Sequence, residues 1–316
     1  MRRFGCRQKY RLSLDFIKNL DKRILALLAA TIATSIFGFN HTIAKELMPN
    51  VLSPNALLYC RVLGAAICFW IASLFFKSEK VEFKDFKLIF ICTLFGMSLN
   101  MITALNGLYN STPINSSIIV TSSPIFIFLI SVILLKEKIS RRKYIGVSIG
   151  FIGTISLILL NEKSIDNAPN IMLGNIYLFL NSIFYALYFV LVKPLTKKYS
   201  MITIMKWLFL FAIFINLPFG FNEFIEIDWK IMDNSSILKL FYVVFCTTFL
   251  VYLLNLYALK NLNASTVGMF IYLQPIIGIL FAIYRGADKL TLLDTTCILL
   301  VFTGVYLVSK RSIKIT

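Results

Sequence analysis

The sequence is poor in charge. Only 15% of its 316 residues are charged, whereas soluble globular domains carry about 25%. Hydrophobic residues make up 58% of the chain and include 29 Phe and 14 Tyr. Too few polar residues are present to cover a water-excluding core, so we exclude a water-soluble domain and expect an integral membrane protein.

Histidine and cysteine are too few and too scattered to build a metal or catalytic centre. His41 is the single histidine, and the six cysteines stand singly. We therefore predict no metal site, no disulfide framework and no cofactor. The chain has no His-Glu-x-x-His motif, no paired intramembrane aspartates and no Ser–His pair, so no catalytic residue is assigned. Gly146–Gly150 matches the hydrolase nucleophile pattern around Ser148, but it lies in an apolar run without a histidine partner. We predict that Gly146, Gly150 and Gly153 instead form a small-residue seam for close helix contact.

Long apolar runs, in contrast, are abundant. A helix of about 20 residues crosses the ~30 Å hydrocarbon core of a bilayer, and it satisfies its own backbone hydrogen bonds there. The sequence predicts ten such spans, at residues 24–44, 56–76, 88–108, 113–135, 144–160, 172–192, 201–221, 237–259, 263–284 and 291–309.

Basic residues are distributed unevenly among the connections between these spans. Of the 32 Lys and Arg residues, 24 fall in segments that share the cytoplasmic side if the N-terminus is cytoplasmic. This is the positive-inside bias that sets membrane orientation. It accounts for the net charge of +17 without a nucleic-acid partner. We expect a multi-pass protein of the cell inner (cytoplasmic) membrane, with both termini in the cytoplasm.

Two segments, Ser117–Gly153 and Gly268–Gly304, are similar to each other. A shift of 151 residues superposes Pro124 on Pro275, Glu137 on Asp288, Lys138 on Lys289, Ser140 on Thr291, Phe151 on Phe302 and Gly153 on Gly304. Each segment belongs to a block of five spans, and an odd number of spans inserts the second copy upside down. We predict an all-α integral membrane protein with ten transmembrane helices as two inverted five-helix repeats, an architecture common among secondary transporters.

The two blocks define the expected organisation of the chain. Its parts are a basic cytoplasmic N-terminal tail at 1–23, a first five-helix repeat at 24–160, an inter-repeat linker at 161–171, a second five-helix repeat at 172–309 and a cytoplasmic C-terminal tail at 310–316.

Polar and aromatic residues recur at helical spacing on six of the predicted spans. Because lipid offers polar groups no partner, such stripes should face the protein interior. We predict a shared substrate cavity with the candidate residues Phe37, Gly38, His41, Asn100, Thr103, Ser117, Thr121, Pro124, Tyr185, Tyr188, Tyr252, Asn255, Tyr272 and Pro275. The alternative is that these groups only bond neighbouring helices, at about 0.6 kcal/mol each.

Four residues suggest particular roles. Pro124 and Pro275 each remove a backbone donor in mid-span, so both mark a hinge or a cavity wall. His41 is the candidate for proton coupling, and a packed neutral imidazole is the alternative. Arg61 lies near the outer end of its span, and we expect it to reach the external headgroups as a structural anchor.

The stretch Phe37-Gly38-Phe39-Asn40, Arg61, and the segments Pro124–Gly153 and Pro275–Gly304 resemble the EamA family of the drug/metabolite transporter superfamily, over residues 24–309. The resemblance implies a ten-helix carrier that works by alternating access, with a cavity lined chiefly by spans 1, 3, 4, 6, 8 and 9. Members of that family handle amino acids, nucleotide-related metabolites or toxic compounds. Two departures, Phe37 in place of a frequent Trp and Asp288 in place of a Glu, leave the expected fold intact.

We therefore expect a secondary transporter of small organic solutes, namely amino acids, related metabolites or drugs. Its partners are the solute and the lipid bilayer, and export is favoured over uptake. An intramembrane enzyme and a non-transporting membrane scaffold are the alternatives. The sequence does not indicate an oligomeric state.

Overall fold

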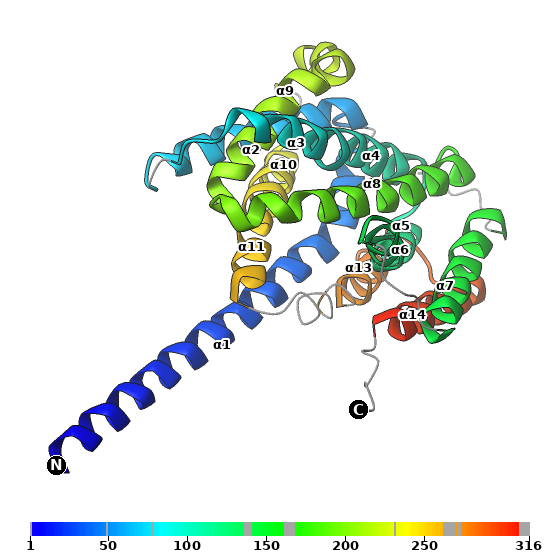
Figure 1. Ribbon diagram of the computed structural model, residues 1–316. Helices are drawn as coiled ribbons and strands as arrows, with labels where there is room; N and C mark the ends of the chain where they lie inside the picture. Colours follow the sequence, from blue (N-terminus) through cyan, green and yellow to red (C-terminus); the bar gives the residue numbers. More distant parts are fainter. Residues whose placement is uncertain are drawn as a thin grey trace.

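The computed structural model describes residues 2–48, 50–76, 79–135, 141–160, 168–230, 232–261, 270 and 273–309 (Figure 1). The regular elements in these ranges are helices, which confirms the all-α prediction. They are α1 (Arg2–Leu47), α2 (Pro54–Ser73), α3 (Phe83–Thr93), η1 (Leu94–Leu99), α4 (Asn100–Asn110), α5 (Pro113–Val120), α6 (Ser123–Leu135), α7 (Arg141–Leu160), α8 (Ile171–Lys198), α9 (Met201–Ile225), α10 (Asn234–Phe241), η2 (Tyr242–Leu250), α11 (Val251–Asn261), α13 (Leu273–Tyr284) and α14 (Leu292–Ser309).

Within the described residues, seven helical stretches are long and apolar enough to cross a membrane. They are Lys22–Leu47, Pro54–Ser73, Phe83–Asn110, Pro113–Ile130, Ile171–Lys198, Met201–Ile225 and Asn234–Ala258. These coincide with predicted spans 1 to 4 and 6 to 8. Three shorter apolar helices, Tyr144–Leu160, Leu273–Tyr284 and Leu292–Gly304, occupy the places of spans 5, 9 and 10. The multi-span prediction is confirmed, and the count of ten crossings stays a prediction.

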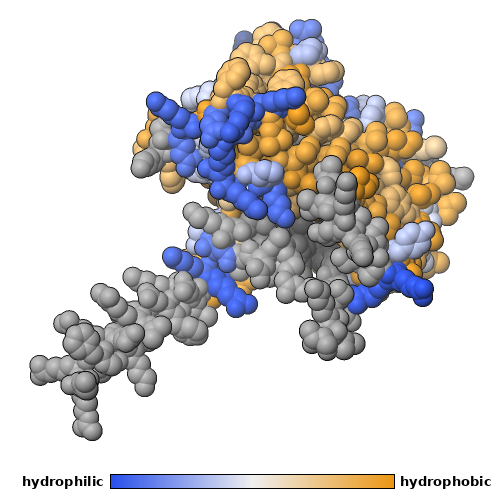
Figure 2. Space-filling view, viewed as in Figure 1, coloured by the Kyte–Doolittle hydropathy of each residue, from blue (hydrophilic) through white to orange (hydrophobic). Residues whose placement is uncertain are grey.

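The surface of the molecule is apolar over much of its described area. In Figure 2, hydrophobic residues cover most of the helical bundle on the face shown, and hydrophilic residues gather in a few clusters. Leu74, Phe83 and Leu292 are at least 80% exposed. A water-soluble monomer rarely exposes large contiguous apolar patches, so this surface suits contact with lipid tails.

Helices α2 and α9 pack against each other in opposite directions. The N-cap of α2, Ser53, bonds Glu223 in the last turn of α9. The N-cap of α9, Ser200, bonds Glu79, which follows α2. Between these ends, Phe69 stacks on Phe209 with ring centroids 5.3 Å apart, within the main hydrophobic core.

Helices α7 and α14 form a second antiparallel pair, seen at one side of the bundle in Figure 1. Arg142 bonds the carbonyl of Leu307, Gly150 faces Gly304, and Gly153 faces Leu300. A Cβ atom on Gly304 would lie 2.5 Å from the Gly150 nitrogen, so the backbones touch. The small residues of this span therefore form a packing seam between helices, as the sequence suggested, and Ser148 lies on a helix rather than on a strand-to-helix turn.

The remaining large contacts come in matched sets. Helix α4 packs on α8, and α11 packs on α1, so spans 3 and 6 meet as spans 8 and 1 do. Likewise, α6 packs on α8 and α13 packs on α1, so spans 4 and 6 meet as spans 9 and 1 do. Each contact in a set therefore has a counterpart between the spans that stand five places away in the chain. The two halves make equivalent contacts.

The helix containing Pro124 is interrupted where the sequence predicts a weakened turn. Helix α5 ends at Val120 and α6 begins at Ser123. The Ser122 hydroxyl donates to the carbonyl of Ile119 at 2.6 Å, and the Ser123 hydroxyl donates to that of Val120 at 2.7 Å. Side chains thus satisfy carbonyls near the break, which a membrane interior requires. In the other half, α13 begins at Leu273, two residues before Pro275.

Spans 3 and 8 each contain a π-helical segment, which the sequence did not predict. They are η1 at Leu94–Leu99 and η2 at Tyr242–Leu250, at matching places in the two halves. In η2 the Thr248 hydroxyl donates to the carbonyl of Val243, five residues earlier, at 2.9 Å. Such wide turns are rare in proteins, and those that do occur are often found at functional sites.

Candidate functional site

The six helices that carry the predicted stripes pack around one another. Helix α1 contacts α4, α5, α11 and α13, while α8 contacts α4 and α5. Glycines permit the close approach: a Cβ atom on Gly38 would lie 2.8 Å from the Ile277 side chain, and one on Gly278 would lie 2.6 Å from the Ser117 hydroxyl. The structure thus brings the stripes of α1, α5 and α13 into contact.

His41 joins three of these helices. Its Nδ1 lies 2.9 Å from the Ser116 hydroxyl of α5, and its Nε2 lies 3.2 Å from the Gln274 amide nitrogen of α13. The side chain is only 8% exposed. With the amide donating to Nε2, the ring carries its proton on Nδ1 and donates to Ser116. Both ring nitrogens are engaged, which favours the packed, neutral imidazole over proton coupling. The contact with Ser116 is a Ser–His pair that the sequence analysis did not expect, but a ring that donates from Nδ1 is not a base toward that hydroxyl.

Asn100 of α4 and Asn181 of α8 form a reciprocal pair across the two halves. The Asn100 amide donates to the Asn181 carbonyl at 3.2 Å, and the Asn181 amide donates to the Asn100 carbonyl at 2.9 Å. Both residues are buried. Nearby, the ring of Tyr188 lies directly over Gly96 of η1, where a Cβ atom would not fit.

The three hydroxyl residues of the candidate list are buried and bond their own helices. Thr103 donates to the carbonyl of Leu99 at 2.7 Å, Ser117 to that of Pro113 at 2.8 Å, and Thr121 to that of Ser117 at 2.7 Å. Such backbone bonding leaves the hydroxyl oxygen available as an acceptor.

The described aromatic candidates of the second half belong to α8 and α11. The Tyr185 and Tyr188 rings are 6.4 Å apart, and Tyr252 packs edge-on against Phe209 at 5.7 Å. Phe37, Asn255, Pro124 and Tyr185 are half-buried, whereas Tyr188 and Pro275 are buried. Tyr272 lies outside the described residues.

Arg61 does not reach the headgroups, and its expected role as an anchor is wrong. The side chain is 6% exposed, and its Nε donates to the Thr248 hydroxyl of η2 at 3.0 Å. Close packing of α2 on η2 encloses it. A charge within a predicted span was the signal that marked it, because intramembrane ionisable groups are functional candidates by default.

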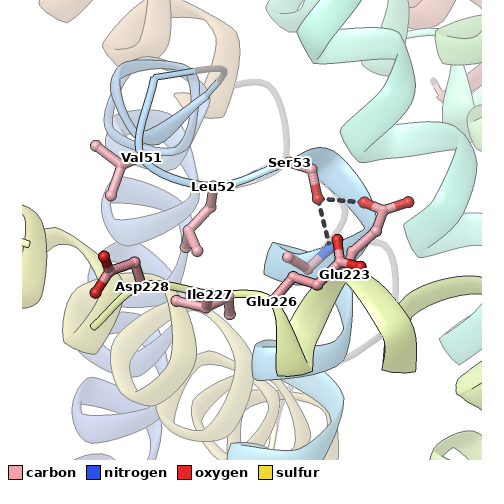
Figure 3. Close-up of a pocket in the computed structure, with 8 residues that line it drawn as sticks. Val51, Leu52, Ser53, Glu223, Glu226, Ile227 and Asp228 are labelled. Carbon is pink, nitrogen blue, oxygen red and sulfur yellow. Dashed lines mark hydrogen bonds between the residues drawn. The ribbon is translucent and has the colours of Figure 1, made fainter. Parts of the chain in front are cut away.

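One end of the bundle is held by polar contacts between segments that the sequence places on the outer side. Glu223 accepts from the Ser53 hydroxyl and, at 2.7 Å, from the Asn55 amide. As Figure 3 shows, Ser53 and Glu223 lie at a pocket of about 280 Å³ that Val51, Leu52, Glu226 and Asp228 also line. This pocket is at the rim of the bundle and contains none of the predicted cavity residues.

Two further contacts belong to the same end. Lys45, at the end of α1, donates to the carbonyls of Leu108 and Tyr109 at 2.9 and 2.5 Å, where α4 ends. Asp288 accepts from the backbone nitrogen of Ile114 at 3.3 Å, where α5 begins. Burial raises the pKa of Asp288 above its ordinary value. Each charge thus lies at the helix end whose dipole favours it.

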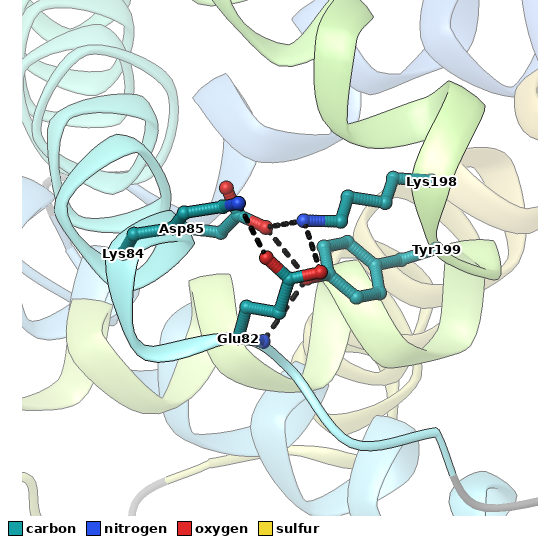
Figure 4. A network of polar contacts seen from close by, with 5 residues as sticks. All are labelled: Glu82, Lys84, Asp85, Lys198 and Tyr199. Carbon is teal, nitrogen blue, oxygen red and sulfur yellow. Dashed lines mark hydrogen bonds and ion pairs between the residues drawn. The ribbon is translucent and has the colours of Figure 1, made fainter.

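The opposite end is held by a network between the start of α3 and the end of α8 (Figure 4). Lys198 pairs with Glu82 at 2.7 Å and with Asp85 at 2.6 Å, and the Tyr199 hydroxyl donates to Asp85 at 2.6 Å. The bond from Lys198 lowers the pKa of Glu82. All of these residues fall in or beside connections that the sequence places on the inner side.

A matching carboxylate contact accompanies this network. Glu79 accepts from the backbone nitrogen of Ser200 at 2.6 Å, and this bond lowers the pKa of Glu79. It is the counterpart of the contact between Glu223 and Ser53, because Ser53 and Ser200 are the N-caps of spans 2 and 7. In the described part of the chain, no group of three or more His, Cys, Asp and Glu side chains could hold a metal ion.

Comparison with known proteins gives a consistent result. The sequence model of the EamA-like transporter family matches residues 24–159 and 172–310. An uncharacterized transporter of Archaeoglobus fulgidus is 26% identical over 82% of this chain and 90% of its own length. The uncharacterized transporter YetK of Bacillus subtilis is 27% identical over 87% and 86%. A WAT1-related protein of Arabidopsis thaliana is 23% identical over 92% and 86%.

A solved crystal structure is similar to this chain in fold. It superposes with a TM-score of 0.62 at 14% identity and covers 90% of this chain and 97% of the other.

Proposed function

The chain belongs to the EamA-like transporter family, and we propose that it is a secondary transporter that moves small organic solutes by alternating access. The solutes that we favour are amino acids, related metabolites and drugs. The direction that we favour is export. The proposed place is the cytoplasmic membrane, with both termini in the cytoplasm.

The antiparallel packing of equivalent helices supports an inverted repeat. Spans 2 and 7 are counterparts, and the residues that join α2 to α9 require these helices to run in opposite directions. The same holds for spans 5 and 10, since residues 142, 150 and 153 meet residues 307, 304 and 300 in turn. Counterpart helices run antiparallel across a two-fold axis in the membrane plane. The two family-model matches, at residues 24–159 and 172–310, agree with two halves of this kind.

The observation that carries the mechanism is the matched pair of carboxylate contacts at opposite ends of α2 and α9. Glu223 holds Ser53 at one end, and Glu79 holds Ser200 at the other. If the halves rock against each other, one contact breaks while the other stays formed. The central residues are then exposed to one side of the membrane at a time.

The interior offers groups that suit an organic solute. Hydroxyl and amide groups of α4 and α5 orient its polar part, and the rings of Tyr185, Tyr188 and Tyr252 enclose its apolar part. Phe37, Tyr185, Tyr252 and Asn255 are half-buried, so part of each side chain is accessible for contact with a solute.

Flux through purified protein in proteoliposomes tests the proposal. Vesicles loaded with labelled amino acids, nucleosides or organic cations should release at least one of them faster than protein-free vesicles do. Imposing and then collapsing a proton gradient measures coupling in the same preparation, and reversing the solute gradient measures direction. A scaffold or an enzyme would give no flux of any solute above that of the empty vesicles.

A further inference from the structure

Arg61 places a positive charge deep inside the helical bundle. It is 6% exposed and lies on α2, about 10 Å along the helix from Pro54. Removing an ion from water is costly unless a partner compensates it. A cation inside a membrane span therefore normally pairs with an acidic group or with backbone carbonyls.

Among the residues that the structure describes, Arg61 has neither. The ion pairs found there involve Glu46, Glu82 and Asp85, all near helix ends. The described hydrogen bond of the Arg61 side chain is the one to Thr248, a neutral hydroxyl. That hydroxyl donates its own proton to the carbonyl of Val243 and so belongs to the π-helical segment.

Lys45 shows how the same chain compensates a buried cation. It is 7% exposed, but its ammonium donates to two carbonyls at the end of α4 and is attracted by the charge of Asp288. Among the described residues, Arg61 has no equivalent arrangement of carbonyls and a carboxylate.

The geometry of the guanidinium selects the kind of anion. Its Nε is engaged by Thr248, which leaves the two terminal nitrogens to act together. These present parallel N–H bonds that match the two oxygens of a carboxylate. The neighbours of Arg61 on α2, Val62 and Ala65, belong to the same hydrophobic core as Tyr188. Tyr185 and Tyr252 pack against that core, and the rings of Tyr185 and Tyr188 are 6.4 Å apart.

We propose that Arg61 binds the carboxylate of a transported organic anion while Tyr185, Tyr188 and Tyr252 enclose its apolar body. This assignment rests on the proposed transport function. Within the proposed solutes it selects carboxylate metabolites related to amino acids over the amino acids themselves. An aromatic or apolar monocarboxylate is favoured over a cation, and also over a zwitterionic amino acid, whose ammonium group would need a carboxylate of its own.

Four probes of one ring size separate the classes in proteoliposomes of the full-length protein. They are phenylpyruvate, phenyl phosphate, phenylalanine and phenyltrimethylammonium, each labelled and each supplied alone. Phenylpyruvate is strongly ionised at neutral pH, so it leaks slowly. We expect the protein to move phenylpyruvate fastest. Phenyl phosphate should move more slowly, because one guanidinium compensates only one charge of a dianion and the other must be removed from water without a partner.

Two substitutions at one position and one matched control complete the test. Arg61→Met should lower phenylpyruvate flux roughly 30-fold or more, the effect of truncating one partner of a buried charge pair. Arg61→Lys keeps the charge but loses the fork, so its flux should be intermediate. Lys206→Met removes a half-buried cation that lies over the Trp70 ring, 5.2 Å from its centroid, and should change neither probe preference nor flux.

Thermal unfolding without solute distinguishes binding from support. Arg61→Met should unfold at the same temperature as the parent protein or higher, because it removes a buried ion that has no acidic partner among the described residues. Saturating phenylpyruvate should raise the unfolding temperature of the parent protein and not that of the variant.

The outcomes separate this inference from the transport proposal. Preferred flux of phenyltrimethylammonium or phenylalanine would leave transport standing and overturn the anion assignment. A variant Arg61→Met that unfolds earlier and loses the flux of all probes equally would make Arg61 structural. Absence of flux for every probe and for the amino acids, nucleosides and organic cations would overturn both proposals.

Discussion

Neutralising Glu223 or Glu79, the two matched carboxylates, should shift the conformational equilibrium of the protein in opposite directions. Glu223 accepts two bonds, from Ser53 and Asn55, and is half-buried. Hydrogen bonds to a buried charged group contribute about 1.5–3 kcal/mol, and we discount this to about 1 kcal/mol because water screens the site. A change of that size alters the ratio of open to closed states about five-fold. Glu223→Gln should open the end at Ser53, and Glu79→Gln should open the end at Ser200.

Cysteine accessibility measures both ends. The reporter substitutions Ala56→Cys and Thr203→Cys place thiols at buried positions in the first turns of α2 and α9. Native cysteines are first replaced, and the rate of modification by a maleimide is recorded in detergent. Glu223→Gln should raise the rate at position 56 about five-fold and lower it at position 203. Glu79→Gln should do the reverse.

Glu226→Gln is the matched control, because it makes the same charge change on an exposed residue of the same connection. It should leave both rates unchanged. If Glu223→Gln and Glu79→Gln raise both reporter rates together, the contacts hold independent helix ends and no rocking couples them. If neither substitution changes either rate, the contacts do not limit opening at all.

Three further predictions concern packing, the helix break and pH. Gly304→Leu should destabilise the protein by about 1–3 kcal/mol in thermal unfolding, because its side chain would push α14 away from Gly150. Pro124→Ala restores a backbone donor at the break between α5 and α6; unfolding temperature should hold or rise while solute flux falls, and unchanged flux would show that the break is not used. Burial raises the pKa of Asp288, so the stability linked to its protonated form is fully present below its ordinary pKa and is lost as pH rises through the raised value. Asp288→Asn should flatten this part of a stability–pH profile, and an unaltered profile would contradict the assignment.

Much of the helical framework follows from local sequence. Apolar runs long enough for a bilayer locate the helices, and Pro124 locates the interruption between α5 and α6, because a missing backbone donor acts on its own turn. The glycines at 146, 150 and 153 indicate a close helix contact for the same reason, since a missing side chain is a local property. These features are readable because each depends on residues a few positions apart.

The contacts of the candidate site depend on residues far apart in the chain. Arg61 and Thr248 are 187 positions apart, and His41 and Gln274 are 233 positions apart. The sequence predicted that Arg61 reaches the headgroups, because it places Arg61 near the outer end of its span. The sequence does not show toward which neighbouring helix the side chain points. The π-helical segments η1 and η2 were also not predicted, since a wide turn carries no single residue signature in an apolar run.

The sequence by itself determined that this is a helical membrane protein of two similar halves, because hydropathy and internal similarity are properties of the chain order. Only the tertiary structure decided which helices pair, which carboxylate holds which helix end, and that Arg61 is enclosed beside the aromatic residues. The reason is physical: in lipid, many packings bury the same apolar area equally well. The choice among them rests on side-chain contacts between segments that sequence order does not bring together.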